Sequence, residues 1–168
     1  LELANLNHPL LKQLFRQAPG TYHHSIAMSQ LSEAAAEAVG ANALHAKVAC
    51  YYHDIGKSLQ PHNFIENQRG VNPHDSLQPH QSANRIRNHV TDGAAMAEMH
   101  DLPEPILDAI WMHHGTGLIK YFYVKALEQA GPDEVVDEQD FRYKGKRPNT
   151  KEAGIIFLAD RVEAACRS

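Results

Sequence analysis

Histidine is the residue type that first asks for a chemical explanation, because 12 of the 168 residues are histidines. Four ionisable side chains continue helical patterns of apolar residues and should therefore face the core: His53, His113, His114 and Asp160. An unpaired carboxylate in a core is costly, because it loses its hydration and gains nothing in return. A divalent metal ion would compensate several histidines and carboxylates that converge from different helices. The sequence therefore predicts a metal site inside a helical domain.

Each of these side chains also has an explanation that needs no metal. A single core histidine is more often hydrogen-bonded than metal-bound, and His53 followed by Asp54 fits a polar pair at a helix end. The pair His113–His114 fits a cationic pair stabilised by the helix dipole, and Asp160 fits an ion pair with Arg161. Because these explanations would have to hold together on several helices, we favour the metal site.

The elements that would position these residues are helical throughout. Apolar residues recur at helical spacing, and no stretch shows the alternation typical of a strand. We expect helices at about 21–39, 82–99 and 118–129, with others before, between and after them, and long loops at 56–79 and 131–149. The expected fold class is all-α, a compact helical bundle of six to eight helices.

Helix ends are marked by proline, glycine and asparagine. Pro9 favours a helix start, Pro19–Gly20 a break, Gly40 a helix stop and Asn42 an N-cap, while Gly93 suggests a join or bend. The helix at 21–39 is expected to bury a stripe formed by Leu31, Ala34, Ala35 and Ala38.

Length, charge and cysteine content narrow the class of protein. A chain of 168 residues fits one domain over 1–168, by the soft prior of about 150 residues per domain. Cys50 and Cys166 are the only cysteines, which argues against a disulfide scaffold or a zinc ribbon, and a net charge of −4 argues against a nucleic-acid polymer as partner. No stretch resembles a membrane span. Because the chain lacks an initiator methionine and stops after a helical pattern, we expect a domain of a longer protein.

Several motifs, taken in order, resemble those of a known superfamily. Residues 53–57 read His-Asp-Ile-Gly-Lys, the HD-x-G-K signature of the HD-domain metal-dependent phosphohydrolases. The superfamily order H…HD…H…HH…D is completed by His24, His89, the pair His113–His114 and Asp160. The complete order is far more specific than an HD dipeptide, which is frequent by chance.

The resemblance extends to one group within this superfamily, the intracellular HD domain of seven-transmembrane HD receptors. It rests on residues 20–25, 64–68, 72–75, 113–116, 121–123 and 158–160. Membership would imply hydrolysis of cyclic di-AMP and a cytoplasmic domain attached to transmembrane helices of a bacterial cell-membrane protein, with no membrane contact by the domain itself. The Gly-Tyr-Pro motif of the HD-GYP enzymes is absent, which weighs against cyclic di-GMP.

The resemblance implies a ligand set for two divalent ions. One ion would bind His24, His53, Asp54 and Asp160, and the other would bind Asp54, His89, His113 and His114. We prefer His24 over the adjacent His23 because it matches the family's position relative to the HD pair. Mixed imidazole and carboxylate ligands suit iron or manganese, with cobalt, nickel or zinc as alternatives in a recombinant preparation. The two ions would activate a bridging hydroxide that attacks the phosphodiester.

Further residues are candidates for contact with the substrate. Lys57, just past the HD pair, would neutralise charge on a phosphate oxygen, in contrast to a solvated loop lysine. The long loop and the helix at 118–129 offer stacking faces and amide groups that would suit a nucleotide, namely Phe64, Asn67, Gln68, His74 and Tyr121. Each of these also fits an ordinary surface or core position.

Three other functions remain open at this stage. The domain could act on another nucleotide, such as cyclic di-GMP, a (p)ppGpp-type compound or a mononucleotide. It could also be a nucleotide sensor without catalysis, or a structural metal domain. A complete set of seven ligands favours the two-metal phosphodiesterase, because a sensor would tolerate loss of ligands. The sequence does not indicate the oligomeric state.

Overall fold

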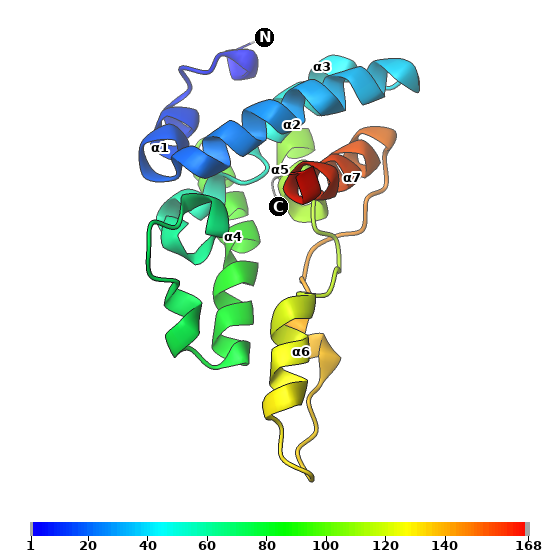
Figure 1. Cartoon of the computed structure of the whole chain (residues 1–168). Helices are drawn as coiled ribbons and strands as arrows, with labels where there is room; N and C mark the ends of the chain where they lie inside the picture. Colours follow the sequence, from blue (N-terminus) through cyan, green and yellow to red (C-terminus); the bar gives the residue numbers. More distant parts are fainter. Residues whose placement is uncertain (1, 167–168) are drawn as a thin grey trace.

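Seven α-helices carry the fold in the computed structural model, which describes residues 2–166 (Figure 1). They are α1 (Pro9–Gln17), α2 (Pro19–Ala38), α3 (Ala43–Tyr52), α4 (Pro79–Met99), α5 (Glu104–Met112), α6 (Lys120–Gln129) and α7 (Lys151–Cys166). Strand-like pairing in the described residues is limited to an isolated bridge between Leu118 and Arg142. The all-α prediction of six to eight helices is confirmed.

The sequence signals at helix ends are partly confirmed. Asn42 caps α3, because its side-chain oxygen accepts a hydrogen bond of 3.0 Å from the backbone nitrogen of His45. Gly40 follows α2 with a φ of +64°, a conformation that glycine adopts without strain. The first helix ends before Pro19 as expected, but the break is the single residue Ala18 and α2 already begins at Pro19. Proline is well suited to the first helical position, where no backbone hydrogen bond is required of it.

Gly93 does not interrupt its helix, contrary to expectation. α4 continues from Pro79 to Met99 without a join. A Cβ atom built at Gly93 would lie 3.3 Å from the backbone nitrogen of Gly56. This glycine therefore serves a close contact between α4 and the turn that follows α3.

The buried face of α2 differs from the predicted stripe. Leu31 is 42% exposed, whereas Ser25, Met28, Ser29 and Ser32 are buried. Two hydroxyl groups on this face have partners: Ser29 donates to the carbonyl of Ile26, and Ser32 accepts from the Cys50 thiol of α3. α2 packs along α3 (Figure 1), and the face with small side chains is buried instead of the more apolar one.

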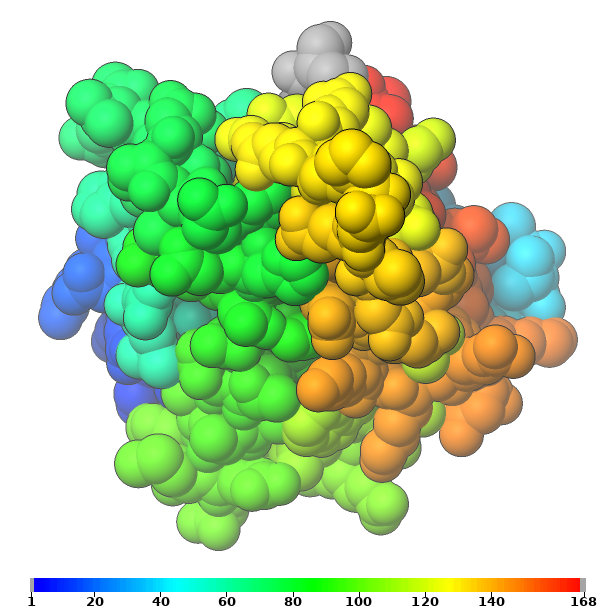
Figure 2. All heavy atoms as spheres, turned by 90° about the horizontal axis from the view of Figure 1, so that it is seen from below, coloured from blue at the N-terminus to red at the C-terminus, as the bar shows by residue number. Residues whose placement is uncertain are grey.

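Two apolar clusters surround the region where the helices meet. The larger cluster joins α1, α3, α4, α5 and α7, and it includes the fully buried Tyr52 and Ile110. The smaller one joins α6 to α4 around Phe122 and Phe141. Figure 2 shows α4 and α6 next to each other on one face of the molecule. α6 is thus packed against α4.

The predicted long loop between α3 and α4 is built from short 3-10 turns. These turns are Ile55–Leu59, Pro61–Asn63, Ile65–Asn67 and Pro73–Ser76. Their irregular spacing explains why the periodicity fails there. Within residues 2–166, none of the helices combines the length and the apolar character needed to span a membrane.

Candidate metal centre

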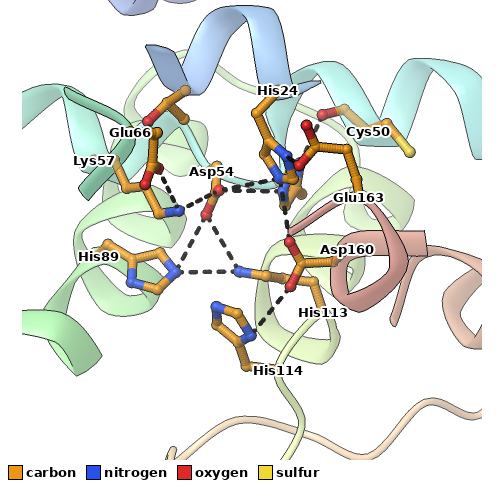
Figure 3. Close-up of polar contacts among 12 residues, drawn as sticks. His24, Cys50, Asp54, Lys57, Glu66, His89, His113, His114, Asp160 and Glu163 are labelled. Carbon is orange, nitrogen blue, oxygen red and sulfur yellow. Dashed lines mark hydrogen bonds and ion pairs between the residues drawn. The ribbon is translucent and has the colours of Figure 1, made fainter. Parts of the chain in front are cut away.

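The helices bring the seven predicted ligands together at the centre of the domain (Figure 3). His24 comes from α2, His53 and Asp54 from the end of α3, His89 from α4, His113 and His114 from the end of α5, and Asp160 from α7. They form one group of His24, His53 and Asp160 and another of Asp54, His89, His113 and His114. Within each group the candidate ligand atoms lie within 4.8 Å of one another.

Asp54, a member of the second group, also faces the first group, because its two carboxylate oxygens point in different directions. Its Oδ2 lies 3.2 Å from Nε2 of His53 and 3.9 Å from Nε2 of His24. Its Oδ1 lies 3.3 Å from Nε2 of His89 and 3.4 Å from Nε2 of His113. A carboxylate in this position can bridge two cations.

Asp160 also faces both groups. Its Oδ1 lies 3.1 Å from Nε2 of His24, and its Oδ2 lies 3.5 Å from Nδ1 of His114. The predicted assignment of Asp160 to the His24 group agrees with the shorter of these distances.

Three histidines of the centre are oriented by backbone carbonyls. Nδ1 of His53 lies 2.7 Å from the Cys50 oxygen, Nδ1 of His89 lies 2.6 Å from the Ile86 oxygen, and that of His113 lies 2.7 Å from the Ile110 oxygen. A carbonyl oxygen only accepts, so Nδ1 carries the proton in each ring. In the neutral ring Nε2 then presents a lone pair to the centre.

The donor set fits divalent cations. Nε2 of His89 and Nε2 of His113 lie 3.1 Å apart, and two lone pairs at this distance repel unless a cation lies between or beside them. Oδ1 of Asp54 and Nε2 of His53 are buried and accept no hydrogen bond from the described residues, while Oδ2 of Asp54 has an ion pair with Lys57 at 2.7 Å. Buried polar atoms of this kind are rare without a partner, and metal ions would supply it.

The electrostatics of the centre favour ionised carboxylates and a neutral His114, whereas the pKa of His53 is raised because Asp54 outweighs its burial. Burial alone would raise the pKa of Asp54, but Lys57 and His53 outweigh burial and hold it well below its usual range. The pKa of Asp160 is also lowered, because its hydrogen bond with His24 and the charge of His114 outweigh burial. Burial and the neighbouring histidines lower the pKa of His114 well below its usual range. Neutral imidazole and ionised carboxylate are the ligand forms.

Lys57 is a buried part of the centre and not a solvated loop lysine. Its Nζ lies 2.7 Å from Oδ2 of Asp54 and 2.9 Å from Oε1 of Glu66. Burial would lower the pKa of Lys57, but the carboxylates of Asp54 and Glu66 raise it overall, so the ammonium stays charged. The ammonium also lies over the Phe64 ring, 4.9 Å from its centroid.

Sequence reasoning missed three residues at the centre. Glu66 holds Lys57 and accepts from the Thr21 hydroxyl at 2.9 Å. Tyr143 stacks on the His114 ring with centroids 4.3 Å apart, and burial raises the pKa of its phenol. Glu163 contacts Nδ1 of His24. Two signals were available: Glu66 lies in the stretch 64–68 that carries the family resemblance, and Glu163 lies three residues after Asp160 and hence on the same side of a helix.

A cavity of about 480 Å³ lies beside the centre and includes most of the predicted substrate contacts. Its lining includes Phe64, Glu66, Gln68, His74, Tyr121 and Phe122. The Phe64 ring meets His89 edge-on with centroids 5.4 Å apart, so the cavity adjoins the second ligand group. Tyr121 is 71% exposed, which leaves its ring free for a ligand.

Two further predicted residues have specific contacts of their own. The side-chain amide of Asn67 makes two hydrogen bonds with Thr21. Its Oδ1 accepts from the Thr21 backbone nitrogen, and its Nδ2 donates to the Thr21 hydroxyl. This gives Asn67 an anchoring contact away from the cavity. Gln68 donates to the His62 carbonyl and to Asn72. His23 is exposed and His24 buried, so His24 is the one of the pair that reaches the centre.

The sequence matches known proteins over its whole length. It is 54% identical over 169 residues to "Cyclic-di-AMP phosphodiesterase PgpH" of Listeria monocytogenes serotype 1/2a (strain 10403S). It is 53% identical over 169 residues to the protein of the same name in Bacillus subtilis (strain 168). Each match covers 100% of this chain, whereas the chain spans only 23% of the length of each relative.

Solved structures and a family model agree with the motifs. The HD domain of the L. monocytogenes phosphodiesterase PgpH in complex with cyclic-di-AMP is 53% identical, with a TM-score of 0.92 over 98% of this chain and 76% of that chain. A second structure of that domain has 52% identity and a TM-score of 0.90, covering 96% of this chain and 75% of that chain. The model of the HD domain matches residues 21–165. The chain therefore belongs to the HD-domain family.

Proposed function

We propose that this domain is a metal-dependent phosphodiesterase that hydrolyses cyclic di-AMP to the linear dinucleotide. The observation that carries the proposal is the position of Asp54, with one oxygen toward each of two ligand groups. Phosphodiester hydrolysis is a reaction that paired divalent ions assist. The two PgpH relatives, which are named cyclic-di-AMP phosphodiesterases, supply the substrate class.

The ligand groups define which residues would hold the ions. The first ion would be held by His24, His53, Asp160 and Oδ2 of Asp54. The second would be held by His89, His113, His114 and Oδ1 of Asp54. We expect iron or manganese, because mixed nitrogen and oxygen ligands suit these metals. When bound, the ions supply Lewis acidity and a water of lowered pKa.

The chain's own residues would bind and orient the phosphodiester. The Lys57 ammonium, held between Asp54 and Glu66, lies where a phosphate beside Asp54 would need a positive charge. Because Glu66 fixes it from the other side, Lys57 is already oriented before substrate arrives. Phe64 packs against both Lys57 and His89 and also lines the neighbouring cavity, so it connects that cavity with the centre.

The cavity next to the centre would receive the nucleotide. The lining of the cavity includes the aromatic rings of Phe64, His74 and Tyr121 and the amide of Gln68. His74 is held by a hydrogen bond of 2.9 Å between its Nε2 and the Asn63 carbonyl. A cyclic dinucleotide is anionic, and the local cations decide its attraction despite the overall charge of −4.

The proposal is tested with manganese-loaded protein and two cyclic dinucleotides in parallel. Chromatography of the products should show linear di-adenylate from cyclic di-AMP and far less product from cyclic di-GMP. Turnover confined to a (p)ppGpp-type compound or a mononucleotide would favour an HD phosphohydrolase of another specificity. No turnover of any nucleotide by protein that holds both ions would favour a nucleotide sensor.

Lys57→Met is expected to lower kcat by about 10²- to 10³-fold, the effect of removing one transition-state donor. Metal content should be retained, because all seven ligands remain. The measurement is steady-state hydrolysis of cyclic di-AMP together with metal analysis of the same samples. Lys12→Met, at an exposed position on α1, is the matched control. A fully active Lys57→Met protein would exclude the proposed role.

We also propose that the full-length protein is a bacterial membrane protein with this domain on its cytoplasmic side. The proposal rests on the resemblance to seven-transmembrane HD receptors. This chain spans only 23% of the length of each relative, so most of the sequence of those proteins lies outside the HD domain and can include transmembrane segments. Fractionation of cells that express the full-length protein should recover the HD domain with the membrane.

A further inference from the structure

Glu163 contacts a ligand of the centre through a carboxylate that is not itself one of the predicted ligands. Its Oε2 lies in hydrogen-bond contact with Nδ1 of His24, while Nε2 of the same ring faces Asp160 at 3.1 Å (Figure 3). Little of either side chain is exposed: 13% of Glu163, which is partly buried, and 1% of His24, which is buried. The contact is therefore shielded from water, where a charge-assisted hydrogen bond is strong.

Three of the other rings are oriented without a side-chain carboxylate at Nδ1, whereas Nδ1 of His114 faces Asp160, itself a predicted ligand, at 3.5 Å. His53, His89 and His113 each donate Nδ1–H to a carbonyl three residues earlier in their own segment. These contacts form with the helix itself, so they need no second element. His24 depends instead on a residue of α7, 139 positions later in the chain.

α7 supplies both Asp160 and Glu163 to the same histidine. Residues three apart on a helix lie on the same face, so both carboxylates point toward α2. Asp160 lies on the Nε2 side of the His24 ring, and Glu163 lies on the Nδ1 side. The ring is therefore held from both ends by one helix.

We propose that Glu163 is a positioning residue that sets the tautomer and orientation of His24 and thereby the affinity of the first ion. The carboxylate accepts from Nδ1–H, which leaves the Nε2 lone pair for the metal and strengthens it as a donor. The rings of the second ion have other partners: His89 and His113 are oriented by backbone carbonyls, and His114 contacts Asp160 and Tyr143. Substitution of Glu163 should therefore weaken the binding of the first ion more than that of the second. The inference rests on the proposed two-ion centre.

The test is a calorimetric titration of metal-free protein with Mn²⁺, comparing wild type with Glu163→Gln and Glu163→Ala. The wild type should bind two ions. Glu163→Gln keeps the volume but loses the charge, and it should weaken one of the two binding phases by about 10- to 100-fold. Glu163→Ala should weaken the same phase at least as much. Because no nucleotide is present, the result is independent of whether the domain hydrolyses cyclic di-AMP.

Electron paramagnetic resonance provides a second readout that a general loss of stability would not reproduce. At two equivalents of Mn²⁺ the wild type should show the signal of a coupled pair. The Glu163 variants should show the signal of an isolated ion instead. Glu128→Gln, at an exposed position on α6, is the matched control and should behave as the wild type.

Three outcomes would overturn the inference. Two binding phases of wild-type affinity in both Glu163 variants would show that Glu163 does not act on the metal. Equal weakening of both phases would indicate a general effect on the fold. A wild type that binds only one ion would contradict the two-ion centre, and the inference with it.

Discussion

Asp54→Ala is expected to remove both ions from the centre and to reduce hydrolysis by at least on the order of 10³-fold. The reason is that the two oxygens of one carboxylate face the two ligand groups, at 3.2 Å from His53 and 3.3 Å from His89. Asp160 also faces both groups, but its ion pairs are with His24 and His114 and not with His53 or His89. Metal analysis after dialysis and hydrolysis of cyclic di-AMP measure the two losses in one preparation.

The fold should survive this substitution, so that the loss can be assigned to the centre. Lys57 keeps its ion pair with Glu66 at 2.9 Å when Asp54 is removed. Thermal unfolding in a chelator should therefore differ little between the variant and the wild type. Addition of Mn²⁺ should raise the Tm of the wild type alone, because a ligand that binds only the folded state stabilises it.

Asp133→Ala is the matched control, since this aspartate is exposed on the loop after α6. It should retain two ions and full activity. If Asp54→Ala itself retained two ions and hydrolysed cyclic di-AMP at the wild-type rate, the bridging role would be wrong.

Helical periodicity predicted the ligands that continue an apolar stripe. His53 and His113 are fully buried, as their spacing after Ala49 and Ile110 implied. The same reasoning was wrong for α2, where Leu31 is exposed and Ser32 is buried. Hydropathy alone does not show which face has small side chains with local hydrogen-bond partners, and such a face can pack against another helix.

The residues that support the ligands were harder to predict, because they meet them across the fold. Glu66 reaches Lys57 from a 3-10 turn, and Tyr143 reaches His114 from the stretch between α6 and α7. Neither segment has a period that would mark one side as facing inward. His24 was likewise identified from the family motif and not from a stripe. The order of motifs thus identified the centre, while its supporting contacts required the structure.

The glycine of the HD-x-G-K motif shows how the sequence and the centre are linked. A Cβ atom built at Gly56 would lie 2.0 Å from the backbone oxygen of His89 and 2.5 Å from the backbone nitrogen of Gly93. These are backbone atoms of α4, so no side-chain rotation can relieve the clash. Position 56 therefore requires a residue without a Cβ atom. The absence of a side chain at Gly56 lets α4 bring His89 close to Asp54.

Gly56→Ala is therefore expected to destabilise the metal-free protein by about 3 kcal/mol or more, at or above the upper end of overpacking costs. Relief of the clash requires α4 to move away from the turn Ile55–Leu59, and this would carry His89 away from Asp54. The second ion should then bind more weakly than the first. Urea unfolding in a chelator measures the stability, and Mn²⁺ titration measures the ions.

Gly154→Ala separates this effect from a general intolerance of alanine at glycine positions. Gly154 lies within α7, and a Cβ atom there would meet nothing within 4 Å. The substitution should stabilise the protein by up to about 1 kcal/mol, because alanine favours the helix. Opposite signs for the two variants would establish the close contact between α4 and the HD turn. Equal stability of Gly56→Ala and the wild type, with both ions bound, would refute it.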